Sequence, residues 1–200
     1  MLNKIILIIS LSLIFSLIGA IFWNQELIYQ LPTPVPNNYS PIQAGEKIFL
    51  DDQLFSPGSK PLLIHFFNPD CPCSKFNVSH FNELLSKYKN RVDFYVVVKS
   101  DEENADIQKF KSKFSQSVTI LTDTDNQIAN KCGVYATPQA VVMNKDRVLF
   151  YRGNYNKSRY CTLHESNYAD IAIDSMLAGK KSPIFDNLAY VPYGCEIPKK

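Results

Sequence analysis

The sequence lacks any run of lysine and arginine interleaved with aromatic residues, so nothing in it suggests a nucleic-acid-binding surface. It also lacks a strong charge of either sign, because 21 basic residues nearly balance 19 acidic ones and leave a net charge of +2. Cysteines are scarce, with five in 200 residues. That is too few for a disulfide-rich scaffold, and the odd number leaves at least one cysteine unpaired in a monomer. Internal repeats and low-complexity segments are absent as well.

The chain does contain enough apolar residues to build a core. Hydrophobic residues make up 46% of the sequence and charged residues 20%, which is typical of a globular protein. A length of 200 residues predicts one domain of about 150 residues with appendages at its ends.

An apolar segment opens the chain. From Ile5 to Trp23 every residue is apolar except three serines and a glycine, a run just long enough to span a bilayer. Residues 1–23 are therefore predicted to be a membrane anchor or uncleaved signal, with cleavage after Ala20 as the alternative. Lys4 precedes the run and the next basic residue is Lys47, so the positive-inside rule places the N-terminus in the cytoplasm. In a bacterium the rest of the chain then lies in the periplasm, held to the inner membrane or, after cleavage, free.

Residues 24–45 are predicted to be a proline-rich linker. Pro32, Pro34, Pro36 and Pro41 favour extended polyproline II geometry, at about 3.1 Å per residue. A stretch of this kind is expected to lift the domain well clear of the membrane. The domain then spans residues 46–180, and residues 181–200 form a tail that packs on it.

Strand and helix patterns alternate along the globular part. The clearest helix has Phe81, Leu84, Leu85 and Tyr88 at the i, i+3, i+4 and i+7 spacing of one apolar face. Strands that alternate with helices and end in a hairpin predict an α/β sandwich with a central mixed sheet. The predicted strands are residues 60–68, 92–99, 118–121, 140–143 and 148–151, and the predicted helices are 72–89, 105–114, 126–131 and one capped by Ser166 that ends at Gly179.

The most informative motif is Cys71-Pro72-Cys73, which follows an apolar strand pattern and begins a helical one. Proline favours the first helical position, where its missing N–H costs nothing, so Cys71 is the expected N-cap. A helix N-terminus stabilises a thiolate through its free N–H groups and its dipole. The placement therefore indicates reactive cysteines, and the alternative is a static clip or two small buried side chains.

Two longer segments resemble the thioredoxin-like superfamily. FFNPDCPCSK (residues 66–75) resembles its strand-to-helix active-site turn, and CGVYATPQAVVMNKDRVLFYRG (132–153) resembles its cis-proline segment and closing hairpin. This resemblance covers about residues 45–180 and implies a thioredoxin-like three-layer sandwich, with Thr137 and Pro138 joined by a cis bond and contacting substrate. With the membrane anchor, the plan is similar to the periplasmic reductases of cytochrome maturation, while YRGNYN and YGCEI are closer to redoxin-like proteins.

The motif departs from the superfamily's pattern in two places. Asp70 stands where thioredoxins have a tryptophan, and Ser74 stands where they have their second cysteine. The charge of Asp70 opposes thiolate formation, whereas Lys75 and the helix N-terminus favour it. Asp70, Pro72 and Lys75 are therefore the candidate supporting residues around the two cysteines.

A Cys-x-Cys pair has its own geometry. Residues two apart in a helix have side chains about 200° apart around the axis, so the pair can close only if Cys71 is non-helical, as an N-cap is. We hypothesise a thiol-disulfide oxidoreductase in which Cys71, the more exposed thiol, attacks and Cys73 resolves the mixed disulfide. If that bond is too strained to form, resolution passes to another cysteine or to a glutathione-like thiol. The expected partners are protein thiols and disulfides in the periplasm and a membrane electron donor, with no cofactor, metal or nucleic acid.

The other three cysteines have separate expected roles. Cys132 is predicted to be a small buried residue. Cys161 and Cys195 lie on either side of the last predicted helix, and a structural disulfide between them is our first expectation, since the compartment permits it. The alternative is a functional Cys195, brought to the site by a flexible tail as the resolving thiol.

Other functions stay open beside this hypothesis. A thiol peroxidase of the redoxin type is disfavoured, because neither cysteine is preceded by that family's P-x-x-x-T-x-x-C pattern. A Cu(I)-binding metallochaperone would use the two close thiolates, with His164 as the candidate histidine. A non-catalytic adaptor is the third alternative. Of the other histidines, His65 is predicted to be a core residue, and His80 lies on the helix that follows the motif.

Overall fold

The computed structural model describes residues 2–37, 39–51, 55, 60–98, 111–114 and 118–197. Within them, five strands form one sheet in the order β3-β2-β1-β5-β6. The central β1 (Leu62–Phe67) runs parallel to β2 (Asp93–Val98), which runs parallel to β3 (Thr119–Thr122). On the other side, β5 (Gln139–Met143) runs antiparallel to β1, and β6 (Leu149–Gly153) antiparallel to β5. The sheet is therefore mixed, which confirms the prediction.

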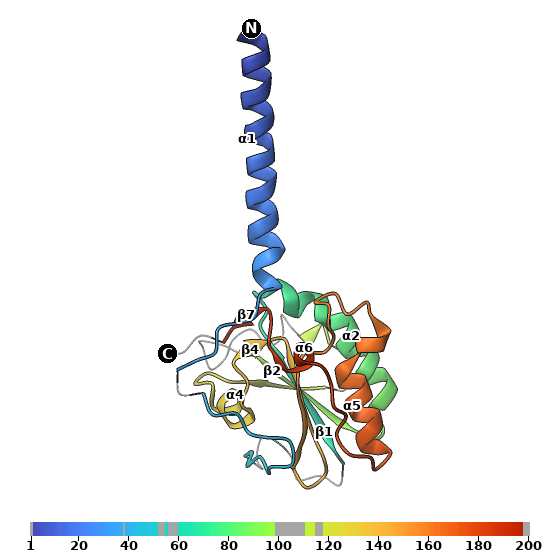
Figure 1. Ribbon diagram of the computed structural model, residues 1–200. Coiled ribbons are helices and arrows are strands. Elements are labelled where there is room, and N and C mark those ends of the chain that lie inside the picture. The colour runs from blue at the N-terminus through green and yellow to red at the C-terminus, as the bar shows by residue number, and fades with distance from the viewer. Residues whose placement is uncertain are drawn as a thin grey trace.

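Helices cover both faces of this sheet. α2 (Pro72–Tyr88) and α5 (Tyr168–Leu177) lie side by side on one face, and the short α4 (Gln127–Cys132) lies on the other (Figure 1). All six residues of β1 are buried, because successive side chains point to opposite faces of a strand and both faces are covered. The three-layer sandwich predicted from the sequence is confirmed.

The predicted elements of the domain lie within one or two residues of the observed ones, apart from the helix predicted at residues 105–114, of which residues 105–110 lie outside the described residues. One helix cap differs. The N-cap of α5 is Asn167, and Ser166 belongs to the preceding turn η2 (His164–Ser166), where its hydroxyl donates to Asn156 Oδ1 at 3.0 Å. The cap prediction for Ser166 is wrong because its hydroxyl is engaged there.

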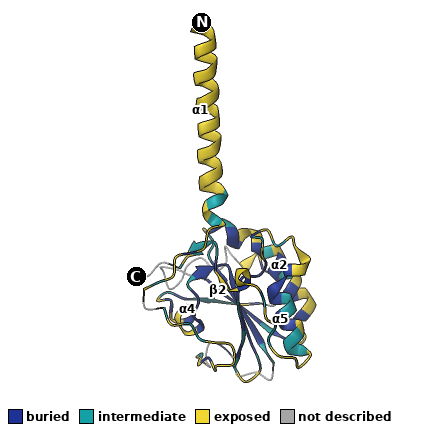
Figure 2. Ribbon diagram, viewed as in Figure 1, coloured by how far each residue is buried: buried dark blue, intermediate teal, exposed yellow. Residues whose placement is uncertain are grey.

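α1 (Leu2–Gln25) projects away from the domain. Every residue in it is exposed, as Figure 2 shows along its whole length. Together with the turn that follows, it contains an 18-residue stretch with a mean hydropathy of 2.8, so it is long and apolar enough to cross a membrane. An apolar helix surface without a protein partner is what lipid would cover.

The chain just after α1 packs on the domain and does not hold it away from the membrane. Glu26 forms an ion pair with Arg159 at 2.8 Å. Thr33 is 5% exposed, and its N–H donates to the carbonyl oxygen of Pro192 at 2.8 Å. The expectation of a spacer that lifts the domain is wrong, because these contacts fix the start of the linker against the domain surface.

A histidine is buried in the middle of β1. His65 is 0% exposed, and its ring stacks on that of Phe81 with centroids 4.7 Å apart. Its Nδ1 lies 2.8 Å from the Tyr155 hydroxyl. Burial, and secondarily the nearby His80, lower the pKa of His65 to about 3. The imidazole is therefore neutral near pH 7, as expected of a core residue.

This depressed pKa predicts acid sensitivity. Below about pH 6.5 the unfolded chain takes up a proton at His65, whereas the folded chain does so only near pH 3. Stability is therefore complete above pH 6.5 and falls toward pH 3, by at most about 1.4 kcal/mol per pH unit. We expect urea unfolding to show a loss between pH 7.5 and pH 4.5 that is about 2 kcal/mol smaller in His65→Gln than in the wild type. Equal losses in the two proteins would contradict this role of His65.

Candidate active site

The Cys71-Pro72-Cys73 turn lies at the pole of the domain where α1 joins it (Figure 1). Cys71 is the N-cap of α2, with extended backbone at φ −81° and ψ 120°, and Pro72 is the first helical residue. The sulfur of Cys71 is bonded to that of Cys195, 124 residues further along, and the two Cα atoms are 5.9 Å apart. The N-terminus of α2 therefore holds a disulfide between its cap residue and the C-terminal tail.

This pairing differs from the two expected first from the sequence, Cys161–Cys195 and Cys71–Cys73. The expected Cys161–Cys195 disulfide is wrong, because Cys161 is a free thiol whose sulfur accepts a hydrogen bond from Asn77 Nδ2 at 3.1 Å. Cys71 is joined to Cys195 and not to Cys73, which is already a helical residue of α2. The observed bond matches the alternative in which the tail brings Cys195 to the turn.

Cys73 is a second, free thiol of the turn. Both Cys71 and Cys73 are 0% exposed, so the expectation that Cys71 is the more exposed of the two is wrong. Burial raises the pKa of Cys73, and the neighbouring Arg159 guanidinium opposes that effect. The sulfur lies 3.9 Å from the carbonyl oxygen of Tyr29, the last residue of the turn η1 (Leu27–Tyr29). The chain that follows the apolar helix therefore covers this thiol.

Arg159 is the residue of this site that the sequence reasoning missed. Its side chain is 3% exposed and pairs with Glu26 at 2.8 Å. It also donates from Nη2 to the carbonyl oxygen of Gln25 at 3.2 Å. The guanidinium lies over three aromatic rings, those of Tyr29, Phe76 and Tyr160. One buried cation thus connects the end of α1 to the first turns of α2.

Arg159→Met is expected to uncover Cys73. Methionine keeps an apolar stem but removes the guanidinium that holds Glu26, and with it η1, over the thiol. Charge-assisted hydrogen bonds are worth about 1.5–3 kcal/mol, so labelling of Cys73 by N-ethylmaleimide in the native full chain should be about tenfold faster or more. Lys87→Met, which removes an ion pair with Asp170 far from the turn, should leave that labelling unchanged. Equal labelling in the two variants would show that Arg159 does not cover the thiol.

The cis-proline segment lines the disulfide. The Thr137-Pro138 peptide bond is cis, as the resemblance implied. β4 (Ala136–Thr137) pairs antiparallel with β7 (Cys195–Glu196), and Cys71 Sγ lies 3.5 Å from the carbonyl oxygen of Thr137. Gly194 lets β7 lie this close to β4. A Cβ at position 194 would overlap the carbonyl oxygen of Thr137.

Buried polar residues of the YRGNYN segment fix the rest of the tail. Asn154 Nδ2 donates to two carbonyl groups in and just after α6 (Asn187–Tyr190), at 2.7 and 2.8 Å. The hydroxyl of Tyr193 donates to the carbonyl oxygen of Asn156 at 2.9 Å. These bonds fix the tail to within two residues of Cys195, which brings that cysteine to the turn.

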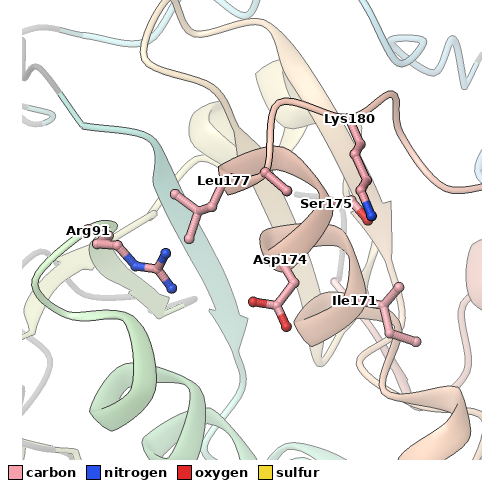
Figure 3. A pocket seen from close by; sticks show the side chains of 7 residues that line it. Arg91, Ile171, Asp174, Ser175, Leu177 and Lys180 are labelled. Carbon is pink, nitrogen blue, oxygen red and sulfur yellow. The ribbon is translucent and has the colours of Figure 1, made fainter.

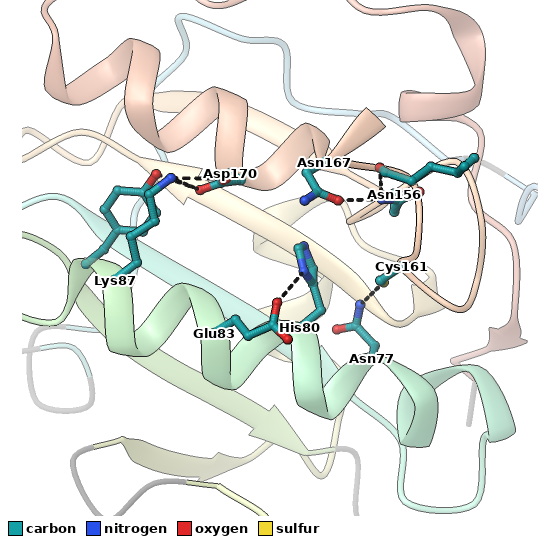
Figure 4. A network of polar contacts seen from close by, with 10 residues as sticks. Asn77, His80, Glu83, Lys87, Asn156, Cys161, Asn167 and Asp170 are labelled. Atoms are coloured by element: carbon teal, nitrogen blue, oxygen red, sulfur yellow. Dashed lines mark hydrogen bonds and ion pairs between the residues drawn. The ribbon is translucent and has the colours of Figure 1, made fainter. Parts of the chain in front are cut away.

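A polar network holds α2 against α5 and the loop before it (Figure 4). Lys87 Nζ lies 2.8 Å from Asp170 Oδ1, and Asn77 holds Cys161 in the loop. Burial raises the pKa of Cys161 to about 11, against the opposing effect of the Asn77 hydrogen bond. Burial also lowers the pKa of His80, and nearby carboxylates oppose it. The network holds α2 against α5, and burial keeps Cys161 a thiol.

The remaining candidate residues lie around the turn or apart from it. Asp70 and Lys75 are exposed and Pro72 is partly exposed. His164 is also exposed, and Cys132 is buried on the α4 side of the sheet. Within the described residues, no group of three or more His, Cys, Asp or Glu side chains is close enough to hold a metal ion.

A hollow of about 460 Å³ lies at the far end of α2, between the chain that follows this helix and the second half of α5 (Figure 3). Arg91, Asp174 and Lys180 are its charged lining residues. The cysteines and the cis-proline segment do not line it, so it is separate from the site at the turn.

Together, the fold and the site define a thioredoxin-like protein with cysteines at the strand-to-helix turn and a cis-proline segment beside them. The chain belongs to the family described as Domain of unknown function (DUF6436), whose model matches residues 42–196. That range contains all five cysteines.

The chain is similar in fold to solved structures and in sequence to curated proteins. A hypothetical protein of Sinorhizobium meliloti 1021 has a TM-score of 0.66 at 19% identity, over 80% of this chain and 97% of that one. A thioredoxin-like protein solved in its oxidized form has a TM-score of 0.52 at 19% identity, over 75% of this chain and 98% of that one. The thiol-disulfide oxidoreductase ResA of Bacillus thuringiensis (strain Al Hakam) is 27% identical over 143 residues, which cover 71% of this chain and 79% of ResA.

Proposed function

We propose that this chain is a thiol-disulfide oxidoreductase whose working disulfide is Cys71–Cys195. The observation behind this proposal is the bond at the N-terminus of α2, a position where cysteines are activated for exchange. The similarity to relatives named thiol-disulfide oxidoreductase ResA supports the same chemistry. Two thiols store the electron pair, so the reaction needs no bound cofactor.

In this proposal Cys71 is the sulfur that reacts with substrate. Once Cys195 has left, Cys71 remains the cap of α2, where backbone N–H groups and the helix dipole stabilise its thiolate. Cys195 is the resolving thiol that closes the disulfide again. Cys73 is the third thiol of the site, and its Cβ would lie 3.5 Å from a Cβ placed on Gly194. Cys73 therefore lies beside the tail as a free thiol, and the resolving step is assigned to Cys195 alone.

The residues around these sulfurs have supporting roles. We assign Thr137 and Pro138 to contact with substrate, because the Thr137 carbonyl oxygen lies 3.5 Å from the Cys71 sulfur and Pro138 follows it through the cis bond. Pro72 fixes the start of the helix. The exposed Asp70 and Lys75 place one charge of each sign at the rim, where they act on an approaching partner more than on the buried sulfurs.

A single-turnover reaction tests the proposal. The full chain in detergent is reduced with dithiothreitol, freed of reductant and mixed with a peptide that contains one disulfide. We expect one peptide disulfide to be reduced per chain, and peptide mapping should recover the Cys71–Cys195 bond. A chain that leaves the peptide oxidised would contradict the proposed activity.

We also place the domain on the periplasmic side of a bacterial inner membrane, with α1 as a single span and the N-terminus in the cytoplasm. The support is the apolar, exposed α1 and the basic Lys4 in front of its apolar run. Partners on that side are protein thiols and disulfides, with a membrane protein as electron donor. Protease added to spheroplasts should digest the domain, and complete protection would contradict this topology.

A further inference from the structure

The C-terminal tail occupies a place that any substrate of Cys71 must also enter. Cys71 is 0% exposed. The first turn of α2 lies on one side of its sulfur, and the carbonyl oxygen of Thr137 lies 3.5 Å away on another. The sulfur of Cys195 lies on the side from which another sulfur can reach Cys71. A foreign sulfur can therefore bond to Cys71 where the sulfur of Cys195 now lies.

The last residues of the tail are held more weakly than those before them. β7 has two residues, paired with Ala136 and Thr137, and Ile197 donates its N–H to the carbonyl oxygen of Tyr135 at 2.9 Å. So short a strand is marginal without its disulfide. Gly194, at φ +112°, precedes it and can act as a hinge. Reduction of the disulfide can therefore release residues 194–197 and uncover the edge of β4.

We propose that this edge of β4 binds an extended, disulfide-bonded segment of a client polypeptide whose reactive cysteine is preceded by glycine. The chain's own Tyr-Gly-Cys-Glu-Ile tail is then a built-in copy of that segment. An open strand edge accepts such a segment through main-chain hydrogen bonds, whatever most of its side chains are. This inference rests on the proposed function and adds its substrate class.

The glycine requirement follows from the register of β7 on β4. Cys195 lies opposite Thr137, so the residue before the cysteine crosses the Thr137 carbonyl group. A Cβ at that place would overlap the carbonyl oxygen, and it would also meet Cβ of Cys73 at 3.5 Å. The obstacle is backbone, which cannot rotate away as a flexible side chain can. A client with a larger residue before its cysteine is therefore expected to bind poorly.

The electron balance of the reaction is simple. The thiolate of Cys71 attacks the client's Gly-Cys sulfur, the client disulfide breaks, and its other sulfur leaves as a thiolate that takes a proton from water. The thiolate of Cys195 then attacks the Cys71 sulfur, the Cys71–Cys195 disulfide forms, and the client's Gly-Cys sulfur leaves as a thiolate. The client gains two electrons and two protons, and the protein is oxidised to the state seen in the structure. As β7 pairs again with β4, it fills the strand position that the client has left.

Peptide disulfides test this inference. The reduced full chain in detergent is mixed with the disulfide-linked dimer of Tyr-Gly-Cys-Glu-Ile, and separately with dimers that have alanine or valine in place of glycine. Each rate is divided by the rate of the same peptide with dithiothreitol, which removes intrinsic reactivity. We expect the glycine peptide to react about tenfold faster than the alanine peptide, with valine slower still, from the usual cost of overpacking. Equal normalised rates would overturn the inference but leave the proposed function intact, whereas no reaction with any peptide would overturn both.

A variant of the tail gives an independent test. Gly194→Ala keeps both Cys71 and Cys195 but cannot close β7 onto β4. We expect it to accumulate the Cys71–peptide mixed disulfide with a lifetime about tenfold or more longer than in the wild type. Gly45→Ala is the matched control, because Gly45 has φ +97° but open space around its Cβ position. If both variants resolve the mixed disulfide as fast as the wild type, the tail does not share the client's place.

Discussion

Cys71→Ser is expected to lower the rate of exchange with a peptide disulfide by about a thousandfold or more, since removal of a catalytic nucleophile has effects of that size. A serine hydroxyl is scarcely ionised near neutral pH, and no other sulfur is the cap of α2. The rate is measured in single turnover on the reduced full chain. Cys132→Ala, which changes a buried thiol on the other face of the sheet, should keep the wild-type rate.

Cys195→Ser separates the two steps of that reaction. The variant retains Cys71, so it should release one equivalent of leaving thiol at nearly the wild-type rate. The peptide should then stay bonded to Cys71, because the resolving sulfur is missing. A Cys71→Ser variant that still reacts within tenfold of the wild type, or a Cys195→Ser variant that still forms free reduced peptide at the wild-type rate, would contradict the assigned roles.

Removal of the crosslink should also destabilise the folded protein. The Cys71–Cys195 bond closes a loop of 124 residues, for which the chain-entropy relation gives about 5 kcal/mol. Measured values usually fall below that ceiling, so we expect Cys195→Ala to lose about 2–5 kcal/mol. For a domain of this size that corresponds to a Tm lower by about 5–15 °C.

Near-ultraviolet circular dichroism of the full chain, without reductant, measures this loss. Cys161→Ala is the control, because Cys161 is a free thiol and its replacement removes no crosslink. A Cys195→Ala variant as stable as the control would mean that the disulfide adds nothing to the fold. The two roles of the bond are linked thermodynamically. The disulfide stabilises the fold, and the folded state stabilises the disulfide against reduction by the same free energy.

The sequence predicted those parts of the molecule that depend on local pattern. β1 is apolar on both faces, α2 has a regular buried stripe, and Pro72 marks the first helical position. The cis bond before Pro138 could not come from spacing, and it was expected only because the segment resembles thioredoxin-like proteins. The strand, the helix stripe and the helix start depend on residues close together in the sequence, which is why the local pattern predicted them.

The pairing of Cys195 was not predictable in the same way. Its partner is 124 residues away, and its position depends on how Asn154 and Tyr193 hold the tail. The available signals were Gly194 beside the cysteine and the polar YRGNYN segment, whose asparagines turn out to be buried. Likewise, the prolines of the linker gave no sign that Glu26 would pair with a buried arginine.

A redox titration shows directly whether Cys71–Cys195 is the working disulfide. The full chain in detergent is equilibrated across a series of thiol-disulfide buffers, quenched, and its cysteines are mapped at each potential. We expect one reversible two-electron couple in which the Cys71 and Cys195 thiols appear and disappear together, while Cys73, Cys132 and Cys161 remain thiols. A reversible Cys71–Cys73 or Cys161–Cys195 couple, with no Cys71–Cys195 bond at any potential, would contradict this expectation.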